Sequence, residues 1–281
     1  AWAINAAAGR EAVTVSDDTL SIASIALDLA KLSNGAFDPT IGPISLLWNI
    51  EGETPHVPTA EELQVLLPLV DWHRVRIDAA KKQVFLEKAG MQLDFGGVAK
   101  GYAALESARI CREYGVRSAL LNMGDSSIYA LGSKANGKPW RIGIQNPDIP
   151  AGTGDSAGVE RGKMLGVVEV ADAVVVSSGT YERFFEWDGK RYHHIMDPKT
   201  GFPVENGLVQ VTLIMPGDTR FADGISTSVF VQGPAAGLRM IEGIPGAAAI
   251  LVTADKRILL SGRAKDLFKL SDPSYRIVDS L

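Results

Sequence analysis

The spacing of the apolar residues changes along this 281-residue chain at Val75. Before that point, the longest apolar pattern is helical. Residues 17–34 carry Leu, Ile and Ala at helical intervals, between Ser16 as an N-cap and Gly35 as a stop. From Val75 onward, short stretches alternate with a period of two and are separated by turn-forming residues. This order predicts an α+β fold with largely antiparallel or mixed sheets and packed helices. The length allows one large domain or two intimate ones, and we expect two intimately associated subdomains.

The other expected elements follow the same two periodicities. A capping box at residues 59–62 predicts a short helix, and Gly96-Gly97 predicts the start of a helix that ends near Gly115. Strands are predicted at 75–78, 83–86, 91–94, 118–122, 127–131, 140–145, 166–170, 173–177, 191–196 and 208–215. Two further helices are predicted at 219–231 and 234–242, and a closing hairpin is predicted to begin at 247–252.

Charge and composition exclude several classes of protein. The net charge of −5, with both signs interspersed, argues against a nucleic-acid partner, which would favour a basic excess. No stretch approaches the roughly 18 uninterrupted apolar residues of a membrane helix, so we expect no membrane span. Cys111 is the single cysteine, which excludes an internal disulfide and a cysteine-based metal cage.

The segment Leu93-Asp94-Phe95-Gly96-Gly97-Val98-Ala99-Lys100 is the first candidate for chemistry. A strand there ends in a carboxylate, two glycines allow close backbone approach, and a helix begins with Lys100 in its first turn. Free N–H groups at a helix start, together with an ammonium group, suit a phosphate. The alternative is a tight strand-to-helix turn that Asp94 caps, and the spacing alone leaves that alternative open.

A second candidate lies in Ala222-Asp223-Gly224-Ile225-Ser226-Thr227. On a helix, Asp223, Ser226 and Thr227 occupy positions i, i+3 and i+4, so their oxygen atoms share one face. A carboxylate, hydroxyls and carbonyls are the hard ligands that Mg²⁺ prefers. The alternative is a polar helix face whose Ser and Thr hydroxyls bond back to helix carbonyls.

Two further segments carry candidate residues. Because strand side chains alternate, His193 and His194 point to opposite faces and do not share a metal, but one could act as a general base. In the loop Gly35-Ala36-Phe37-Asp38-Pro39, Phe37 could lie against a flat ring. The alternative for this loop is a hydrophobic plug with an Asx turn.

The order of these motifs is more specific than any one of them. GAFDPTIGP followed by Trp48, then LDFGGVAKGY, SSGTYERFFEWDGKRYHHIMDPKTGFP and ADGISTSVFVQG, strongly resemble the FAD:protein FMN transferase family. These proteins are also called ApbE-like flavin transferases. The resemblance extends over residues 5–252 and implies a single flavin transferase domain over residues 1–281. It also implies that a family N-terminal segment, with adenine or flavin contacts, precedes Ala1.

The resemblance implies roles for individual residues. Matches to FAD or flavin-nucleotide contacts are Ala36, Phe37, Asp38, Asp94, Lys100 and Met196. Matches to magnesium ligands are Gly97, through its backbone carbonyl, Asp223, Ser226 and Thr227. His194 matches the family's proposed catalytic base. Asp125 stands where the family often has a glycine, so it either narrows the flavin site or adds a metal-facing carboxylate.

The implied reaction is a magnesium-dependent cleavage of FAD that moves FMN to a Thr or Ser hydroxyl of an acceptor protein and releases AMP. Two alternatives stay open: a magnesium-dependent FAD pyrophosphatase, in which water replaces the hydroxyl, and a flavin-binding protein without catalysis. The resemblance further implies that the acceptor is a membrane redox subunit. The expected location is the periplasm or the outer face of a bacterial cytoplasmic membrane, with a lipid anchor in a preceding segment as one possibility.

Overall fold

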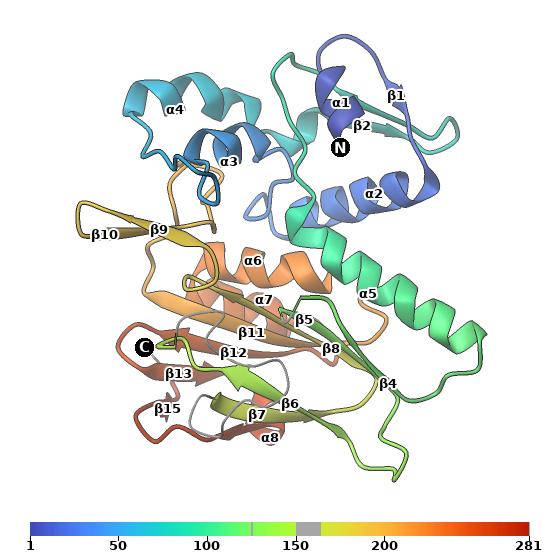
Figure 1. Cartoon of the computed structure of the whole chain (residues 1–281), viewed down its shortest axis with the longest axis vertical. Coiled ribbons are helices and arrows are strands. Elements are labelled where there is room, and N and C mark those ends of the chain that lie inside the picture. Colours follow the sequence, from blue (N-terminus) through green and yellow to red (C-terminus); the bar gives the residue numbers. More distant parts are fainter. Residues whose placement is uncertain (125, 150–163, 281) are drawn as a thin grey trace. The chain divides into compact units, whose positions relative to one another are not determined.

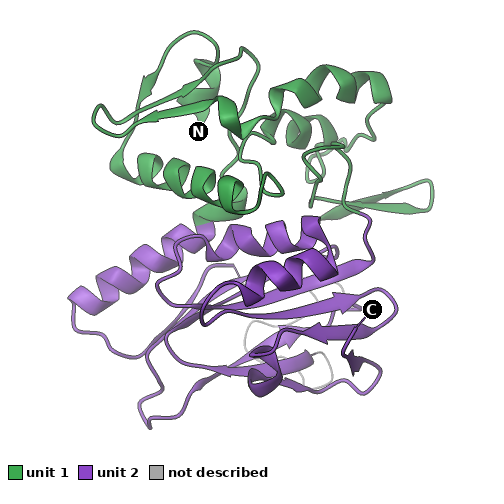
Figure 2. Ribbon diagram, turned by 180° about the vertical axis from the view of Figure 1, so that it is seen from behind, with its two compact units in different colours: residues 1–99, 183–204 green, residues 100–182, 205–281 purple. Residues whose placement is uncertain are grey.

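The chain forms two compact units, which are coloured separately in Figure 2. The structure is a computed structural model that describes residues 1–124, 126–149 and 164–280. Unit 1 comprises Ala1–Ala99 and Arg183–Val204, and unit 2 comprises Lys100–Glu182 and Glu205–Leu281. Each unit is therefore built from two separate pieces of sequence, and the backbone passes between the units at three points. The expectation of two subdomains is confirmed.

Unit 1 combines short helices with small antiparallel sheets (Figure 1). Its helices are α1 (Trp2–Ala6), α2 (Asp17–Leu32), α3 (Gly42–Trp48), α4 (Ala60–Leu66) and the first turn of α5 (Gly96–Glu113). Its strands are β1 (Val13–Thr14), β2 (Val75–Asp78) and β3 (Gln83–Leu86), in the order β1-β3-β2, and the hairpin of β9 (Phe184–Trp187) with β10 (Lys190–His193). Single 3₁₀ turns, Leu67–Leu69 and Trp72–Arg74, lead from α4 to β2.

Local capping explains where two of these helices begin. The Ser16 hydroxyl accepts the Thr19 backbone N–H at the start of α2. At the start of α4, the Thr59 hydroxyl accepts the Glu62 N–H, and the Glu62 carboxylate accepts the Thr59 N–H at 2.8 Å. Gly35 follows α2 with φ of +77°, a conformation that favours glycine. These predicted boundaries are confirmed within two residues.

Trp48 lies at the centre of one core of unit 1. Its indole is fully buried and donates its N–H to the Gly201 carbonyl oxygen at 2.7 Å, although the two residues are 153 positions apart. The rings of Phe185 and Tyr192, from the β9–β10 hairpin, pack within 6.3 Å and 5.3 Å of the Trp48 ring, measured between centroids. The segment that carries this hairpin therefore belongs to the same core as α3.

Unit 2 contains a seven-stranded sheet with the order β15-β13-β12-β11-β8-β5-β4 and a three-stranded sheet with the order β14-β7-β6. The described pairs are antiparallel except β13 with β15, so the predicted mixed, largely antiparallel pairing is confirmed. The strands are β4 (Ala119–Asn122), β5 (Ser127–Leu131), β6 (Trp140–Gln145), β7 (Met164–Val170), β8 (Ala173–Gly179), β11 (Leu208–Pro216), β12 (Ala248–Thr253), β13 (Arg257–Leu260), β14 (Phe268–Leu270) and β15 (Arg276–Val278). The helices are α6 (Ala222–Gln232), α7 (Pro234–Glu242), α8 (Ala264–Leu267) and the rest of α5.

The two faces of the large sheet have different neighbours. Val175 on β8 and Ile214 on β11 belong to a buried cluster with Val168 and Phe268 of the smaller sheet. Side chains alternate along a strand, so Val176 and Ser178 lie on the opposite face. The first turns of α6 contact β8 and β11, and Ser178 bonds to Ser226 on α6. Figure 1 shows α6 and α7 beside these strands.

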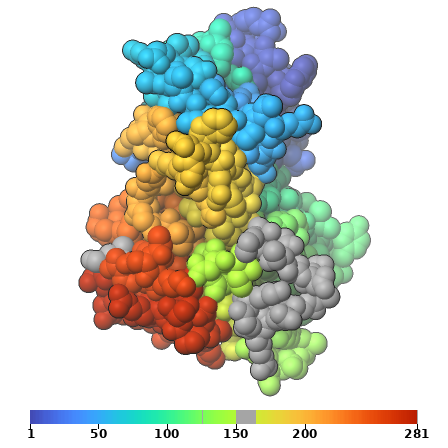
Figure 3. Space-filling view, turned by 60° about the vertical axis from the view of Figure 1, so that its left-hand side comes forward, coloured from blue at the N-terminus to red at the C-terminus, as the bar shows by residue number. Residues whose placement is uncertain are grey.

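Two sequence predictions need correction. Residues 91–94 form only an isolated β-bridge, between Gln92 and Ile41, and no strand, because the backbone N–H and C=O of Leu93 bond to the side chain of Asn5. The strand expected at 191–196 is the second arm of a hairpin and ends at His193. Asp188 and Gly189 both have positive φ in its turn, and Trp187 beside them is 63% exposed. The hairpin segment is the yellow surface in Figure 3.

Among the described residues, no helix combines the length and apolar character needed to cross a bilayer.

Candidate functional site

The candidate residues are divided between the two units. Unit 1 carries Ala36, Phe37, Asp38, Asp94, Gly97, His194 and Met196. Unit 2 carries Lys100, Asp223, Ser226 and Thr227. Asp125 lies outside the described residues.

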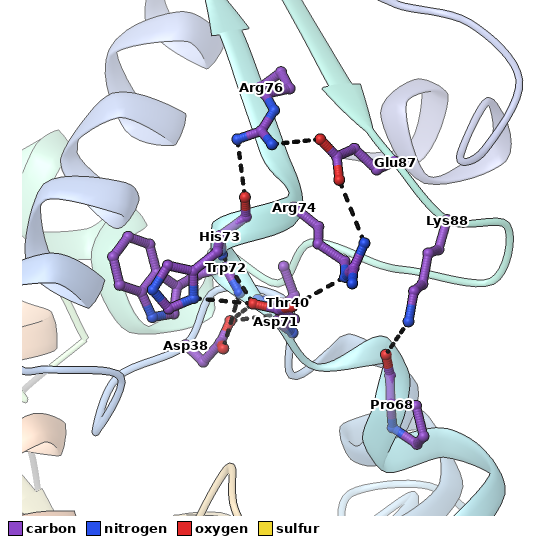
Figure 4. Close-up of polar contacts among 10 residues, drawn as sticks. All are labelled: Asp38, Thr40, Pro68, Asp71, Trp72, His73, Arg74, Arg76, Glu87 and Lys88. Atoms are coloured by element: carbon purple, nitrogen blue, oxygen red, sulfur yellow. Dashed lines mark hydrogen bonds and ion pairs between the residues drawn. The ribbon is translucent and has the colours of Figure 1, made fainter.

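Asp38 is a buried carboxylate that organises its own loop (Figure 4). Its Oδ1 accepts the Thr40 backbone N–H at 2.8 Å and the Thr40 hydroxyl at 2.6 Å, and its Oδ2 accepts the Trp72 N–H at 3.2 Å. Burial raises the pKa of the Asp38 carboxyl, and the three hydrogen bonds oppose that rise. The Asx turn weighed as an alternative is therefore present, and FAD contact by Asp38 stays a prediction.

A polar network continues behind this loop. The fully buried Thr40 hydroxyl accepts the Asp71 backbone N–H at 2.8 Å, and the Asp71 carboxylate accepts a hydrogen bond from Arg74 at 3.0 Å. Arg74 also lies 3.5 Å from Glu87 on the segment after β3. Figure 4 shows the chain of contacts from the Asp38 loop to the β2–β3 hairpin. The 36–38 segment is therefore fixed to the small sheet of unit 1.

We expect Asp38→Asn to lower the free energy of unfolding by about 1–2 kcal/mol. Whichever way the amide is turned, its NH₂ group faces a backbone N–H that the carboxylate accepted. A buried polar group without a partner costs about 1–3 kcal/mol. We expect a value at the lower end of that range, because the substitution also removes a buried charge, which is itself unfavourable. Urea unfolding measures the change.

The matched control for this prediction is Asp78→Asn. Asp78 lies in the same unit, and its side chain is 42% exposed. It accepts the Lys81 backbone N–H at 3.0 Å and forms an exposed ion pair with the Lys81 ammonium group at 3.3 Å. We expect the control to change stability by less than about 0.5 kcal/mol. Equal unfolding midpoints for Asp38→Asn and wild type would contradict the role given to Asp38.

Phe37 and Gly97 lie against each other. Phe37 is buried, and a Cβ atom built on Gly97 would lie 2.8 Å from the Phe37 ring. Only a glycine lets the ring lie this close to the first turn of α5. Asp94 stands just before that turn, where its Oδ1 accepts the Gly96 N–H at 2.7 Å and its own N–H bonds to the Pro39 carbonyl. Asp94 thus caps α5 and links it to the 36–39 loop.

His193 and His194 differ as the alternation predicts. His193 is buried, with Nε2 3.1 Å from the Val204 carbonyl and Nδ1 accepting the Ile195 N–H. His194 is only partly buried, and its Nδ1 lies 3.2 Å from the Arg183 carbonyl oxygen. A carbonyl oxygen only accepts, so Nδ1 of His194 carries the proton and the lone pair of the neutral ring is on Nε2. That tautomer is competent as a base.

Met196 belongs to the core of unit 1. It is 7% exposed and packs in the cluster of Trp48, Ile44 and Leu63. Ala36, by contrast, is half-buried on the loop that Asp38 organises. Flavin contacts by Met196 and Ala36 stay predictions.

In unit 2, α5 and α6 approach closely beside Asp223. A Cβ atom built on Gly101 would lie 2.8 Å from the Asp223 Cβ and 3.2 Å from its backbone nitrogen. Gly101 follows Lys100 on α5, and the Lys100 ammonium group donates a hydrogen bond to the Ser126 hydroxyl just before β5. The absence of a side chain at Gly101, the residue after Lys100, therefore lets α5 lie directly against Asp223.

The first turns of α6 supply the oxygen atoms predicted as metal ligands. Asp223 and Ser226 are buried, and Thr227 is half-buried. The Ser226 hydroxyl donates to the Asp223 carbonyl at 2.8 Å, as the alternative with back-bonding hydroxyls anticipates, and it lies 2.7 Å from the Ser178 hydroxyl. One carboxylate and two hydroxyls on one helix face fit Mg²⁺, which prefers oxygen ligands and keeps several waters.

This donor set differs from metal cages built of protein side chains alone. Within residues 1–124, 126–149 and 164–280, no group of three His, Cys, Asp and Glu side chains is placed to hold a metal ion. A cation on α6 would therefore take hydroxyl, carbonyl, water or phosphate oxygens besides Asp223. Sequence reasoning missed Ser126, Ser178 and Thr40. Thr40 lies in the quoted motif GAFDPTIGP and Ser178 in SSGTYERFF, whereas Ser126 lies outside the quoted motifs.

The comparisons with known proteins all indicate one protein family. Residues 1–251 match the sequence model of the ApbE family. A protein of Treponema pallidum named FAD:protein FMN transferase is 36% identical over 286 residues, which cover 97% of this chain and 76% of that protein. A protein of the same name from Klebsiella pneumoniae is 36% identical over 279 residues, covering 98% of this chain and 82% of that protein.

Solved structures lead to the same family. The crystal structure of the ApbE protein from Thermotoga maritima superposes with a TM-score of 0.82 at 32% identity, over 94% of this chain and 82% of that chain. The flavinyl transferase ApbE of Pseudomonas stutzeri gives a TM-score of 0.77 at 31% identity, over 94% of this chain and 79% of that chain.

Proposed function

Because this chain belongs to the ApbE family, we propose that it is an FAD:protein FMN transferase whose reaction requires Mg²⁺, modifies a Thr or Ser hydroxyl and releases AMP. The transferase activity follows from relatives that share more than a third of its residues over most of both chains. One observation carries the finer proposal. In unit 2, Gly101, the residue after Lys100, lies against Asp223 on α6, the helix that also carries Ser226 and Thr227.

The proposed transfer of FMN needs no oxidant or reductant. The acceptor oxygen forms a bond to the phosphorus of the FMN half, and the bond from that phosphorus to the bridging oxygen breaks. AMP leaves with the bridging oxygen, and FMN remains attached through a phosphoester. The hydroxyl proton is lost as the oxygen attacks, and the negative charge that develops is spread over phosphate oxygens.

The residues of unit 2 suit the phosphate side of this reaction. The Lys100 ammonium group is a cation on a flexible stem, and it would stabilise charge on the pyrophosphate. Asp223, Ser226 and Thr227 would hold Mg²⁺, with the Gly97 carbonyl as a further proposed ligand. When bound, Mg²⁺ neutralises charge on the phosphate oxygens and orients them for displacement.

His194 suits the acceptor side. Its bond from Nδ1–H to the Arg183 carbonyl fixes the orientation of the ring, and we assign His194 the role of the base that takes the hydroxyl proton. Ala36, Phe37, Asp38, Asp94 and Met196 would contact FAD. The Asx turn and the cap on α5 support this proposal, because they fix the loop and the helix start together.

The test separates transfer from hydrolysis. The protein is incubated with FAD, Mg²⁺ and an acceptor domain that carries a Thr in a candidate motif, and AMP, free FMN and the acceptor mass are measured. AMP equal to the FMN bound to acceptor supports the transferase. AMP equal to free FMN, with no labelled acceptor, would instead favour the pyrophosphatase. Intact FAD under all conditions would contradict both.

Removal of the metal is expected to stop the reaction. EDTA should lower AMP release by at least about a hundredfold, because the lost metal stabilises the transition state by several kcal/mol. Excess Mg²⁺ should restore the rate, measured by chromatography of AMP. A rate that EDTA leaves within about threefold of the untreated rate would remove the metal from the mechanism.

The proposed acceptor is a membrane redox subunit, which would be reached from the periplasm or the outer face of the cytoplasmic membrane. Fractionation of cells that express the full-length protein tests this location. Recovery in the cytoplasm would contradict it.

A further inference from the structure

Ser178, on β8, is linked to the proposed metal helix by a side-chain hydrogen bond. Its hydroxyl oxygen lies 2.7 Å from the hydroxyl oxygen of Ser226 on α6. Both residues belong to unit 2. We propose that Ser178 is a positioning residue that fixes the Ser226 hydroxyl and the first turn of α6 for Mg²⁺ binding. This inference rests on the proposed function, because it concerns the metal ligands assigned there.

The direction of the hydrogen bonds follows from counting protons. A serine hydroxyl has one hydrogen and two lone pairs. The hydrogen of Ser226 is directed to the Asp223 carbonyl at 2.8 Å, so Ser178 must donate the bond that joins the two hydroxyls. The Ser226 oxygen then keeps one lone pair, and this lone pair can bind a cation. Ser178 thereby makes Ser226 an acceptor toward anything else it binds.

The same strand end also holds the partner of Lys100. The Ser177 backbone N–H donates to the Ser126 carbonyl at 2.8 Å, and the Ser126 hydroxyl accepts from the Lys100 ammonium group. Residues 177 and 178 therefore connect, within unit 2, the proposed phosphate-binding lysine with the proposed metal ligands. A fixed spacing between these groups is what a pyrophosphate with a bound cation requires.

The hydrogen bond between Ser178 and Ser226 is expected to contribute little to the free energy of unfolding. A hydrogen bond between two neutral hydroxyls contributes about 1 kcal/mol net, and replacement of such a pair by apolar groups of similar shape can be nearly neutral. The neighbouring helix-facing residues of β8, Val174 and Val176, are apolar. A serine at 178 is therefore better explained by the ligand that it orients, since partners that orient metal ligands typically change metal affinity by about 10- to 100-fold.

Ser177 offers a matched control on the same strand. Its hydroxyl lies 2.9 Å from the Thr212 hydroxyl on β11, so it forms the same kind of pair. Alternation along β8 puts Ser177 on the face that packs against the smaller sheet, away from α6. Ser177→Ala therefore removes an equivalent hydroxyl without touching the metal helix.

The experiment measures Mn²⁺ binding to the full chain by electron paramagnetic resonance, with and without FAD. We expect Ser178→Ala to raise the Mn²⁺ dissociation constant by about 10- to 100-fold, and Ser178→Thr to restore it to within about threefold of wild type. The Ser177→Ala variant should bind Mn²⁺ as wild type does. The dissociation constant of FAD in EDTA should be the same for all four proteins.

Three results would overturn the inference. Wild-type Mn²⁺ affinity in Ser178→Ala would refute the positioning role while leaving the metal site in place. Equal weakening by Ser177→Ala and Ser178→Ala would assign the effect to the packing of β8. A wild-type protein that binds no Mn²⁺, with or without FAD, would remove the metal assignment of the proposed function as well.

Discussion

Asp223→Asn is expected to lower the rate of FMN transfer by about a thousandfold, which corresponds to about 4 kcal/mol of lost transition-state stabilisation. The substitution keeps the shape of a buried side chain that lies against Gly101, so we expect the fold to be retained. It removes the only carboxylate among the proposed ligands, and a neutral amide oxygen is a much weaker ligand for Mg²⁺. The measurement is AMP release over a range of Mg²⁺ concentrations.

Ser228→Ala is the matched control for Asp223→Asn. Ser228 is a fully buried polar residue on the same helix, and its hydroxyl bonds back to the Gly224 carbonyl at 3.2 Å. Its loss perturbs α6 without touching the proposed ligands, and we expect a rate within about threefold of wild type. If Asp223→Asn remains folded and also stays within that range, Asp223 does not hold the metal.

His194→Gln is expected to lower the turnover number by about 10²- to 10⁴-fold, the usual effect of a lost general base. Glutamine retains an N–H donor for the Arg183 carbonyl but has no basic nitrogen. The dissociation constant of FAD and the melting temperature should both change little, because His194 is partly exposed and its loss opens no core cavity. Single-turnover measurements with labelled acceptor isolate the chemical step.

A substitution of the neighbouring His193 is the control for His194→Gln. His193→Gln should destabilise the protein, because buried His193 bonds to the Val204 carbonyl and to the Ile195 N–H. Its folded fraction should transfer FMN at a rate near that of wild type. If His193→Gln lowers transfer as much as His194→Gln does, at equal folded fraction, the assignment of the base to His194 is wrong.

Features set by short-range sequence were predictable from the residues. The caps at Ser16 and Thr59 and the positions of most strands depend on neighbours a few residues away. Residues 91–94 show the limit, because their extended backbone pairs with the side chain of Asn5, some 88 positions earlier, and no local pattern encodes that partner. The dipeptide Asp188-Gly189 is typical of a tight hairpin turn, so the β9–β10 hairpin was predictable from local sequence. The strand predicted at 191–196 was placed too late in the chain for this hairpin to be recognised.

The candidate site shows the same division. The i, i+3, i+4 spacing predicts that Asp223, Ser226 and Thr227 share one face of a helix, and all three do lie on α6. The contacts that support these residues come from other strands and could not be read from spacing. Ser178 reaches Ser226 across 48 positions, and Ser126 reaches Lys100 across 26. The burial of Met196 likewise depends on Trp48 and α3, far earlier in the chain.

The bond between Trp48 and Gly201 has a consequence for the order in which this protein can fold during synthesis. The indole of Trp48 finds its acceptor and its ring neighbours only in the piece of chain 183–204. The ribosome makes residues 100–182 before that piece, so the core around α3 stays open until residues 183–204 have been translated. Unit 1 therefore completes this core only after residues 100–182 of unit 2 have been made, and residues 1–99 alone cannot close it.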